Sequence, residues 1–492
     1  MNLEALLSSI EPLQVSGPKD REITSLQYDS RRVERGSLFF ALPGARADGA
    51  TFIAQAAAKG AVAFVSEKVD FHQGATGILV KDARAAMADL AAAFYQQPTL
   101  SMKLAGVTGT NGKTTTAFLI KHICNATLHN CGLLSTVRYE IGDRVLPAVR
   151  TTPESLDVND MLWQMRNAGC RYGAMEVSSH ALVQSRVRQV EFDTAVFTNL
   201  TQDHLDYHKT MDAYFEAKSL LFTGLARQKK KKDATSVVNI DDRYGSLLLG
   251  RLAGTKVISY GVSARADFRA SNIRSDFTGS SYQLDANNRS FLVRLPLIGL
   301  FNVYNSIAAI AAATAMGIDL REAVLSLANA AAVPGRMEAV SGQRNFKVFV
   351  DYAHTDDALI NALKTLRELQ PARIITVFGC GGNRDRGKRP RMGAAVDQYS
   401  DLAIVTSDNP RNEDPLAIIE DIKPGLKRGA YEIVPDRREA IFHAIDLAGP
   451  RDIVLIAGKG HETTQEFATE TIPFDDVAIA RSALDAKRTD WP

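Results

Sequence analysis

A glycine-rich turn between an apolar segment and a helical segment constrains this chain more than any other feature. Residues 104–108 are typical of a buried strand, and residues 109–115 carry two glycines before a helix expected over 117–123. Such a turn aims backbone N–H groups and a helix N-terminus at one point, which suits a polyphosphate. Lys113 would reach the β- and γ-phosphates, and the Thr114 hydroxyl would bind Mg²⁺. The strict P-loop has glycine where this chain has Val107, so the turn is a variant of that motif.

Composition favours a reduced protein of the cytoplasm. The 492 residues are 45% hydrophobic and 23% charged, as in soluble proteins with sizeable cores. A net charge of +2 gives no bias towards nucleic acid or anionic membranes, and the lysine run 229–232 is typical of a solvated loop. The four cysteines form no CxxC pair. No signal peptide is expected, and the apolar stretch 307–318 is too short for membrane insertion.

Three segments differ in their rhythm of strands and helices. Residues 1–100 alternate short strands with alanine-rich helices. Residues 101–335 repeat a βαβ pattern, with antiparallel strands expected over 265–300 and helices over 302–316 and 320–332. Residues 336–492 alternate strands and helices in the manner of a doubly wound sheet. The sequence therefore predicts an α/β fold of three domains: a small N-terminal α/β domain, a central P-loop ATPase-like domain and a C-terminal Rossmann-like domain.

Two polar clusters follow predicted strands of the central domain. Glu176 ends one strand and is followed directly by Ser178, Ser179 and His180. Residues 203–208 contain two aspartates and two histidines, although the whole chain has nine histidines. Carboxylates and imidazoles together are compatible with Mg²⁺ or Mn²⁺ beside a bound nucleotide, although imidazole is an unusual Mg²⁺ ligand. A hydrolytic zinc centre built from residues 203–208 is an alternative at this point.

The third domain carries arginines in its loops. Arg411 lies in the turn 408–411, and Arg384 lies in a glycine-rich loop. A guanidinium can clamp a carboxylate in two places, and Glu462 could receive an ammonium group. These residues predict a pocket for a zwitterionic, amino-acid-like ligand. Surface loops with ordinary salt bridges are the alternative.

The order of these motifs resembles the Mur ligases, the ATP-dependent amino-acid ligases of peptidoglycan precursor synthesis. The resemblance covers essentially the whole chain and rests on residues 109–115, 176–180, 198–206, 302–305, 334–338 and 351–354. Within the family, residues 408–411 resemble the branch that adds meso-2,6-diaminopimelate to UDP-N-acetylmuramoyl-L-alanyl-D-glutamate. Lysine-adding relatives lack the equivalent of Arg411. Diaminopimelate has a second amino-acid head, so its extra carboxylate needs an extra guanidinium.

The resemblance implies a role for each matching residue. The expected ATP-binding residues are Gly109, Thr110, Asn111, Gly112, Lys113, Thr114, Thr115, Asn302, Arg336, Asp351 and His354. Those for the UDP-substrate are Ser30, Ala45, Arg46, Ala47, Thr151, Thr152, Ser178, Gln184 and Arg186. Those for diaminopimelate are Arg384, Asp408, Asn409, Pro410, Arg411, Gly458 and Glu462. The catalytic set is Lys113, Glu176, His204 and Lys218, and the Mg²⁺ ligands are Thr114, Glu176, His204 and Lys218 as an N-carboxylated lysine.

The resemblance also implies domain roles and a partner set. Residues 1–100 would bind the UDP-substrate, 101–335 ATP, and 336–492 the amino acid, in a monomer with a hinge near 336. Three positions depart from the family pattern: Arg46 and Arg150 beside the UDP-substrate residues, and Asp356 at the start of a helix. The alternatives are a lysine-adding or folylpolyglutamate-type ligase, or a nucleotide-dependent scaffold protein.

Overall fold

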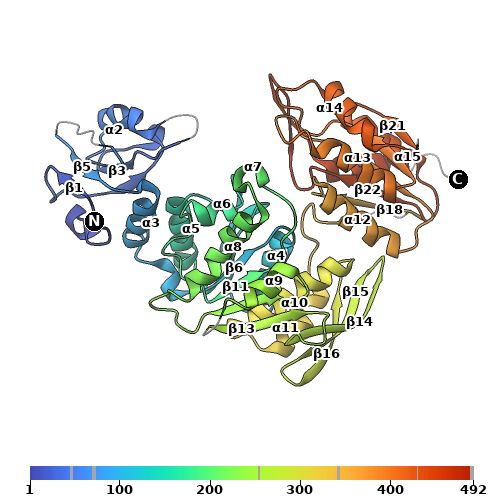
Figure 1. Ribbon diagram of the computed structural model, residues 1–492, viewed down its shortest axis with the longest axis horizontal. Helices are drawn as coiled ribbons and strands as arrows, with labels where there is room; N and C mark the ends of the chain where they lie inside the picture. The colour runs from blue at the N-terminus through green and yellow to red at the C-terminus, as the bar shows by residue number, and fades with distance from the viewer. Residues whose placement is uncertain (45–47, 69–73, 253–254, 341–343, 429, 488–492) are drawn as a thin grey trace.

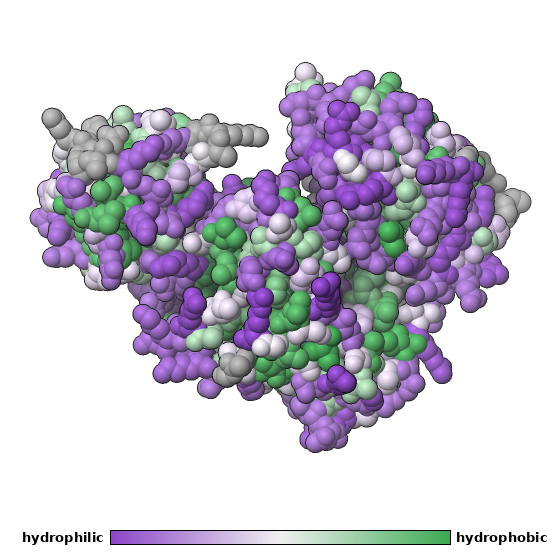
Figure 2. Space-filling model, in the orientation of Figure 1, coloured by the Kyte–Doolittle hydropathy of each residue, from purple (hydrophilic) through white to green (hydrophobic). Residues whose placement is uncertain are grey.

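The computed structural model describes residues 1–44, 48–68, 74–252, 255–340, 344–428 and 430–487. Three sheets, each covered by helices, follow one another along the chain (Figure 1). The predicted α/β fold of three domains is therefore confirmed. The N-terminal and C-terminal units stand as two lobes over the central unit, and the face in Figure 2 is mostly hydrophilic.

The N-terminal unit is a five-stranded sheet of order β1-β5-β4-β3-β2. Only β1 runs antiparallel, and the residues of β3 and β4 are buried throughout because helices and loops cover both faces. The strands are β1 (Gln14–Ser16), β2 (Ser25–Gln27), β3 (Ser37–Phe40), β4 (Ala63–Ser66) and β5 (Thr76–Leu79). The helices are α1 (Leu3–Leu7), α2 (Ile53–Ala58) and α3 (Ala83–Phe94).

The central unit has an eleven-stranded sheet of order β16-β15-β14-β13-β12-β11-β6-β10-β7-β8-β9. Its middle is parallel and its two edges are antiparallel, as predicted for residues 265–300. The parallel strands are β6 (Lys103–Thr108), β7 (Cys131–Leu134), β10 (Tyr172–Glu176), β11 (Thr194–Phe197), β12 (Thr235–Asn239) and β13 (Lys256–Gly261). The edge strands are β8 (Arg138–Ile141), β9 (Arg144–Pro147), β14 (Phe268–Asp276), β15 (Gly279–Ala286) and β16 (Arg289–Leu295).

Strand register sets how far along the sheet each site residue lies. Strand β6 lies between β10 and β11, with Glu176 opposite Val107 and Phe197 opposite Thr108. Val107 is fully buried in the core, and the turn begins two residues later. The residues after β6, β10 and β11 therefore emerge side by side at one edge.

Helices cover both faces of the central sheet. They are α4 (Lys113–Ala126), α5 (Ser155–Asn167), α6 (Ser179–Val183), α7 (Leu205–His208), α8 (Met211–Leu225), α9 (Arg243–Leu249), α10 (Leu300–Ala315) and α11 (Leu320–Ser326). The alanine-rich stretch is buried in α10, which packs with α4 in one core. Helix α11 ends earlier than the predicted 332, because the chain tightens into a 3₁₀ turn at Leu327–Asn329. No helix in the described ranges is long and apolar enough to cross a membrane.

The C-terminal unit is a six-stranded sheet of order β17-β18-β22-β19-β20-β21, parallel except for β17. The strands are β17 (Glu338–Val340), β18 (Lys347–Asp351), β19 (Ile374–Phe378), β20 (Leu402–Val405), β21 (Tyr431–Ile433) and β22 (Ile453–Ala457), with a separate hairpin of β23 (Thr464–Glu466) and β24 (Thr471–Pro473). The helices are α12 (Asp356–Glu368), α13 (Lys388–Tyr399), α14 (Pro415–Ile422), α15 (Arg437–Leu447) and α16 (Asp476–Ala486). The predicted doubly wound pattern is confirmed.

Candidate active site

A cavity of about 350 Å³ lies where the carboxyl edge of the central sheet meets the C-terminal unit. Fourteen of the predicted residues line it: Thr110, Asn111, Gly112, Lys113, Thr114, Thr115, Thr151, Glu176, Ser178, His204, Lys218, Arg336, Asp351 and His354. The two sheets thus contribute to one site.

The phosphate loop owes its shape to two glycines. Gly109 has φ +150° and Gly112 has φ +84°. A Cβ on Gly109 would lie 1.8 Å from Thr198 Oγ1, and one on Gly112 would lie 2.3 Å from Asn305 Oδ1. The Thr198 hydroxyl donates to the Asn111 carbonyl at 2.6 Å. The loop therefore fits tightly between β11 and α10, and only glycine satisfies both its φ angles and this close approach.

Lys113 begins α4 and curls back over the loop. Its Nζ donates to the carbonyl oxygens of Gly109 at 3.0 Å and Thr110 at 2.7 Å. Burial lowers the pKa of Lys113, although Glu176 and Asp203 raise it. The N-terminus of α4 and this amine together give an anion-binding site at the bottom of the cavity.

Lys218 reaches the same loop from α8. Its side chain is 1% exposed, its Nζ donates to the Gly109 carbonyl at 2.7 Å, and it lies 4.6 Å from the centre of the Tyr214 ring. Burial lowers the pKa of Lys218 well below its ordinary value, and the charge of Lys113 lowers it further. A neutral lysine amine is a nucleophile, as carbamate formation requires.

Pattern reasoning alone missed Lys218, yet the sequence holds a signal for it. The buried face of α8 includes Tyr214, Lys218, Leu221 and Leu225, which recur at helical spacing. A lysine on this apolar stripe is unusual, because lysines are rarely buried unless paired.

Glu176 faces the cavity from the end of β10, and His204 faces it from the loop between β11 and α7. The Glu176 carboxylate is buried and accepts from the backbone N–H of Thr136 at 2.8 Å and from its hydroxyl at 3.1 Å. Burial lowers the pKa of His204 to about 4, although Asp203 opposes this shift. The imidazole is thus neutral at pH 7. The Glu176 carboxylate and the Thr114 hydroxyl on one cavity are oxygen donors that Mg²⁺ accepts, so these residues fit the ion, whereas the His204 imidazole is an unusual Mg²⁺ ligand.

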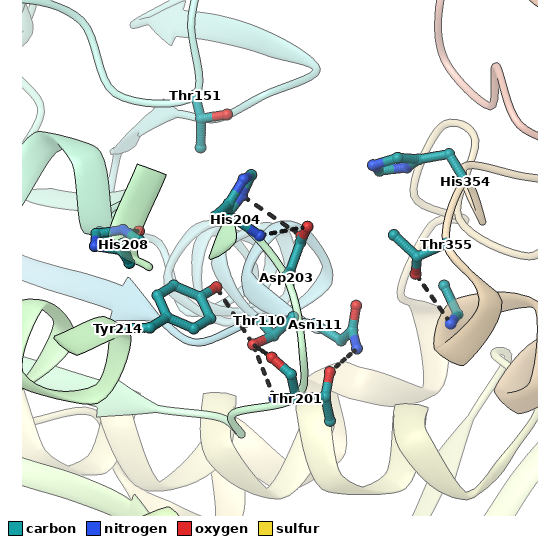
Figure 3. A network of polar contacts seen from close by, with 12 residues as sticks. Thr110, Asn111, Thr151, Thr201, Asp203, His204, His208, Tyr214, His354 and Thr355 are labelled. Carbon is teal, nitrogen blue, oxygen red and sulfur yellow. Dashed lines mark hydrogen bonds and ion pairs between the residues drawn. The ribbon is translucent and has the colours of Figure 1, made fainter. Parts of the chain in front are cut away.

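The aspartates and histidines of 203–208 do not converge. His208 is buried, lies 2.8 Å from Ser179 Oγ and stacks on Tyr214, away from Asp203 and His204 (Figure 3). Within the described ranges no group of three or more His, Cys, Asp or Glu side chains could hold a metal ion.

Asp203 connects the central unit to the C-terminal unit. Burial would raise its pKa, but His204 and Lys388 lower it to about 2, and Lys388 Nζ lies 3.2 Å from its carboxylate. Asp357 of α12 accepts from Asn111 Nδ2 at 3.2 Å and from Thr201 Oγ1 at 3.0 Å. Hydrogen bonds therefore join the phosphate loop directly to the C-terminal unit.

The other predicted nucleotide residues support the cavity in different ways. The Arg336 guanidinium donates to Thr114 Oγ1 at 3.2 Å and lies 4.5 Å from the centre of the Tyr352 ring. Asn302 is buried behind Asn305 and accepts from its amide at 3.2 Å, so Asn305 rather than Asn302 lines the cavity. Sequence reasoning did not single out Asn305.

The predicted UDP-substrate residues span two units. Thr152 Oγ1 donates to the Glu176 carbonyl at 2.8 Å, and Gln184 accepts from Arg186 at 2.7 Å. Ser30 lies in the N-terminal unit, where its hydroxyl donates to Gln55 at 2.7 Å. Ala45, Arg46 and Ala47 lie outside the described residues.

The predicted diaminopimelate residues gather beyond β19, β20 and β22. Arg411 has φ +54° and donates through Nε to Glu466 at 2.9 Å and through Nη1 to the Gly382 carbonyl at 2.9 Å. Arg384 is exposed on the neighbouring loop. A Cβ on Gly458 (φ +119°) would lie 2.5 Å from the Asp408 carboxylate. Pro410 is buried between these loops.

A buried lysine holds two of these side chains together. Lys459 is 0% exposed, and its Nζ donates to Asn409 Oδ1 at 2.8 Å and Glu462 Oε2 at 3.0 Å. Asn409 donates in turn to Glu462 at 2.8 Å. His461, the residue before Glu462, lies 5.0 Å from Tyr352 between ring centres, and Tyr352 lines the main cavity. The loop that carries Lys459 and Glu462 therefore adjoins the cavity.

A phosphate loop whose cavity is closed by a second α/β unit defines a class of three-unit nucleotide-binding proteins. The chain matches the Mur ligase family, catalytic domain over residues 22–95, the Mur ligase middle domain over 107–313, and the Mur ligase, glutamate ligase domain over 335–460. The chain belongs to the Mur ligase family.

Individual relatives match over the full length. A UDP-N-acetylmuramoyl-L-alanyl-D-glutamate–2,6-diaminopimelate ligase of Geobacillus thermodenitrificans is 46% identical over 99% of this chain and 100% of its own. A ligase of the same name from Solibacter usitatus is 46% identical over 98% of both chains. A solved structure of a ligase of that name is 35% identical, covers 99% of this chain and 100% of its own, and has a TM-score of 0.71. A folylpolyglutamate synthase of Mycobacterium tuberculosis shares the fold at 16% identity, covering 83% of this chain and 96% of its own, with a TM-score of 0.63.

Proposed function

We propose that this protein is an ATP-dependent ligase that joins meso-2,6-diaminopimelate to the D-glutamate of UDP-N-acetylmuramoyl-L-alanyl-D-glutamate. The full-length relatives of that name support the proposal. The observation that carries it is that the loops bearing Arg384, Arg411 and Glu462 adjoin the phosphate-loop cavity, since His461 contacts Tyr352, which lines that cavity. The reaction belongs to cytoplasmic peptidoglycan precursor synthesis.

The proposed reaction has two steps. An oxygen of the D-glutamate γ-carboxylate attacks the γ-phosphorus of ATP, so a carboxyl–phosphate bond forms and ADP leaves. A neutral amine of diaminopimelate then attacks the acyl carbon, loses a proton, and expels inorganic phosphate as the amide forms. The protein contributes by positioning the reactants and neutralising their charge.

The residues at the bottom of the cavity act on the transferred phosphoryl group. Lys113 and the N-terminus of α4 bind the ATP phosphates, where their charge stabilises the developing negative charge. Thr114, Glu176, His204 and Lys218 would hold Mg²⁺, which when bound neutralises phosphate charge. Lys218 would do so as a carbamate, formed when its neutral amine adds to CO₂ and releases a proton. Arg336, Asp351 and His354 bind the nucleotide from the C-terminal unit, and Asn302 orients Asn305.

Substrate recognition is divided between the two outer units. Residues 1–100 bind the UDP-substrate with Ser30 and the segment 45–47, while Thr151, Thr152, Ser178, Gln184 and Arg186 bind it from the central unit of 101–335. Residues 336–492 bind diaminopimelate through Arg384, Asp408, Asn409, Pro410, Arg411, Gly458 and Glu462. The protein acts as a monomer and closes about a hinge near 336.

Mass analysis of the product tests the proposal. Purified protein incubated with UDP-N-acetylmuramoyl-L-alanyl-D-glutamate, ATP, Mg²⁺ and meso-diaminopimelate should form the UDP-tripeptide and one phosphate per product. Parallel reactions with lysine, or with folate and glutamate, should release no phosphate above background. Product with either of those and none with diaminopimelate would establish a lysine-adding or folylpolyglutamate-type ligase, whereas nucleotide binding without turnover would favour a scaffold protein.

A further inference from the structure

Three guanidinium groups converge on the single carboxylate of Glu154, just before α5. Arg84 Nη1 lies 3.1 Å from one Glu154 oxygen, Arg186 Nη2 lies 3.1 Å from the other, and Arg150 bonds to that second oxygen. Glu154 is buried, and its one negative charge faces three positive charges. Asp157, one turn further, is engaged by the Tyr28 hydroxyl at 2.6 Å and by the charge of Arg32. The cluster therefore keeps a surplus of positive charge.

The cluster lies at the junction of the N-terminal and central units. Arg84 comes from α3 of the N-terminal unit, while Arg150 and Arg186 come from loops of the central unit. The main cavity is adjacent, because Thr151 lines it, and Arg186 Nη1 donates to the Thr152 carbonyl at 2.9 Å. Thr136 connects both regions, since its hydroxyl lies 3.0 Å from Thr151 Oγ1 and 3.1 Å from Glu176.

The backbone of Arg150 is held in place. The buried Tyr139 hydroxyl donates to the Arg150 carbonyl at 2.6 Å and accepts from the N–H groups of Val149 at 3.2 Å and Arg150 at 3.0 Å. Glu154, four residues on, then anchors the guanidinium. A long side chain that is fixed at both ends loses little conformational entropy when it binds a ligand.

Some N–H donors of these arginines are still free to bind a ligand. Arg186 Nε is buried without a hydrogen-bond partner in the described part of the chain, and the Arg150 side chain is 50% exposed. Buried unpaired donors are rare and costly, so their presence beside a cavity points to an acceptor that arrives with a ligand. Guanidinium groups pair best with the planar oxygens of a carboxylate or with phosphate.

We propose that Arg150 is a specificity-determining residue that, together with Arg186, binds the free α-carboxylate of the substrate's D-glutamate. The proposal rests on the function proposed above. The γ-carboxylate of that residue reacts beside Glu176, and the α-carboxylate is only a few bonds away in the same amino acid. The diphosphate is separated from the reacting carbon by the sugar, the lactyl group and alanine. The position of Arg150 beside Thr151 therefore favours the α-carboxylate over the diphosphate.

Calorimetric titration tests this assignment without requiring turnover. Wild type, Arg150→Asn and Arg150→Lys are each titrated with UDP-N-acetylmuramoyl-L-alanyl-D-glutamate and with the analogue that carries D-isoglutamine, whose α-carboxylate is an amide. Arg150→Asn should raise the Kd for the acid roughly 10- to 100-fold, the effect of losing a hydrogen bond to a charged group. Arg150→Lys should recover part of the loss, and added salt should shrink the difference. For the amide, wild type and Arg150→Asn should have the same Kd.

Arg188→Asn is the matched control. Arg188 is also 50% exposed and also crosses the junction of the two units, where its Nε lies 2.9 Å from Asp89. Arg188→Asn should leave both Kd values unchanged. Arg150→Asn should bind ATP as wild type does. It should also keep the thermal midpoint of wild type, because Glu154 retains two guanidinium partners. An unchanged Kd in Arg150→Asn, or an equal loss in Arg188→Asn, overturns the proposal. An equal loss for acid and amide assigns the anion to the diphosphate and also overturns it. If wild type forms no tripeptide product, only the proposed function is rejected. The Kd differences between wild type and Arg150→Asn do not depend on it, because they are measured without diaminopimelate.

Discussion

The amine of Lys218 lies 2.7 Å from the carbonyl oxygen of Gly109, the first residue of the phosphate loop. This contact joins α8 to the loop across the bottom of the cavity. Burial of the same amine and the charge of Lys113 lower its pKa well below the ordinary value, so its environment disfavours a positive charge.

Lys218→Ala should abolish ligase activity while leaving the fold intact. The variant removes the proposed carbamate, so added formate or acetate should restore part of the activity by supplying a carboxylate at the same place. Phosphate release under saturating substrates measures both effects. The exposed Lys229 provides the control, since Lys229→Ala should behave as wild type with or without added acid. Full activity in Lys218→Ala would remove Lys218 from the metal site.

Arg411→Ala should raise the KM for diaminopimelate roughly 10- to 100-fold, because a guanidinium that pairs with a carboxylate is lost. The KM for ATP should stay unchanged, since Arg411 is not among the residues that line the ATP cavity. Arg367 also pairs with a carboxylate in this unit, Asp401 at 2.6 Å, and Arg367→Ala should leave both constants unaltered. Equal increases for ATP and diaminopimelate would show that Arg411 is structural.

Asp357→Ala should lower kcat/KM for ATP roughly tenfold, about the effect of one charge-assisted hydrogen bond. The carboxylate accepts from Asn111 and Thr201, so its loss separates α12 from the phosphate loop. Its neighbour Asp356, which lies 3.5 Å from Arg391 within the C-terminal unit, is the control. Steady-state kinetics should show Asp356→Ala close to wild type, and a similar defect in both variants would contradict a specific contact between units.

Gly112→Ala should weaken ATP binding by roughly 100-fold, because the loop must move away from Asn305 and small displacements of binding groups are expensive. Gly317 has φ +99° and open space at its Cβ position, so Gly317→Ala adds backbone strain without a clash. That variant should lose about 1 kcal/mol of unfolding free energy and no ATP affinity. Titration with a non-hydrolysable ATP analogue distinguishes the two.

Stability should fall as the pH is lowered from 6.5 towards 4, partly because of His208. Burial lowers its pKa to about 4 from an ordinary value of 6.5. Between these values the unfolded chain binds a proton that the folded chain does not, so this stabilisation is complete above pH 6.5 and is lost progressively down to pH 4. In urea unfolding at several pH values, His208→Gln should flatten this slope. Equal slopes in wild type and His208→Gln would refute the assignment to His208.

The sequence predicted elements better than it predicted which side chains meet. The phosphate loop and the parallel strands carry strong local signals, namely glycines at required positive φ and short apolar runs. His208 shows the limit, because His204 has φ +54° ahead of the single-turn helix α7, so helical spacing does not place the two rings on one face. Lys218 and Lys459 were not found by pattern, because burial of a lysine depends on packing between distant segments.

Two contacts of the structure could not be read from neighbouring residues alone. Glu154 gathers arginines from residues 84, 150 and 186, which lie on three separate segments. Asn305, rather than Asn302, lines the cavity, because the face of α10 that carries Asn305 lies against Gly112. Both depend on how units and helices pack, which single-sequence patterns do not encode.

The register between β10 and β6 sets the position of Glu176 relative to the phosphate loop. Glu176 stands opposite Val107, which sets the carboxylate level with the loop that follows β6. Deleting one residue within β10 would turn Glu176 to the opposite face of the sheet, because side chains alternate along a strand. Deleting two would keep the face but draw the carboxylate back by about 7 Å, beyond reach of the loop. Length variation in this strand should therefore be less tolerated than substitution of most side chains that line the cavity.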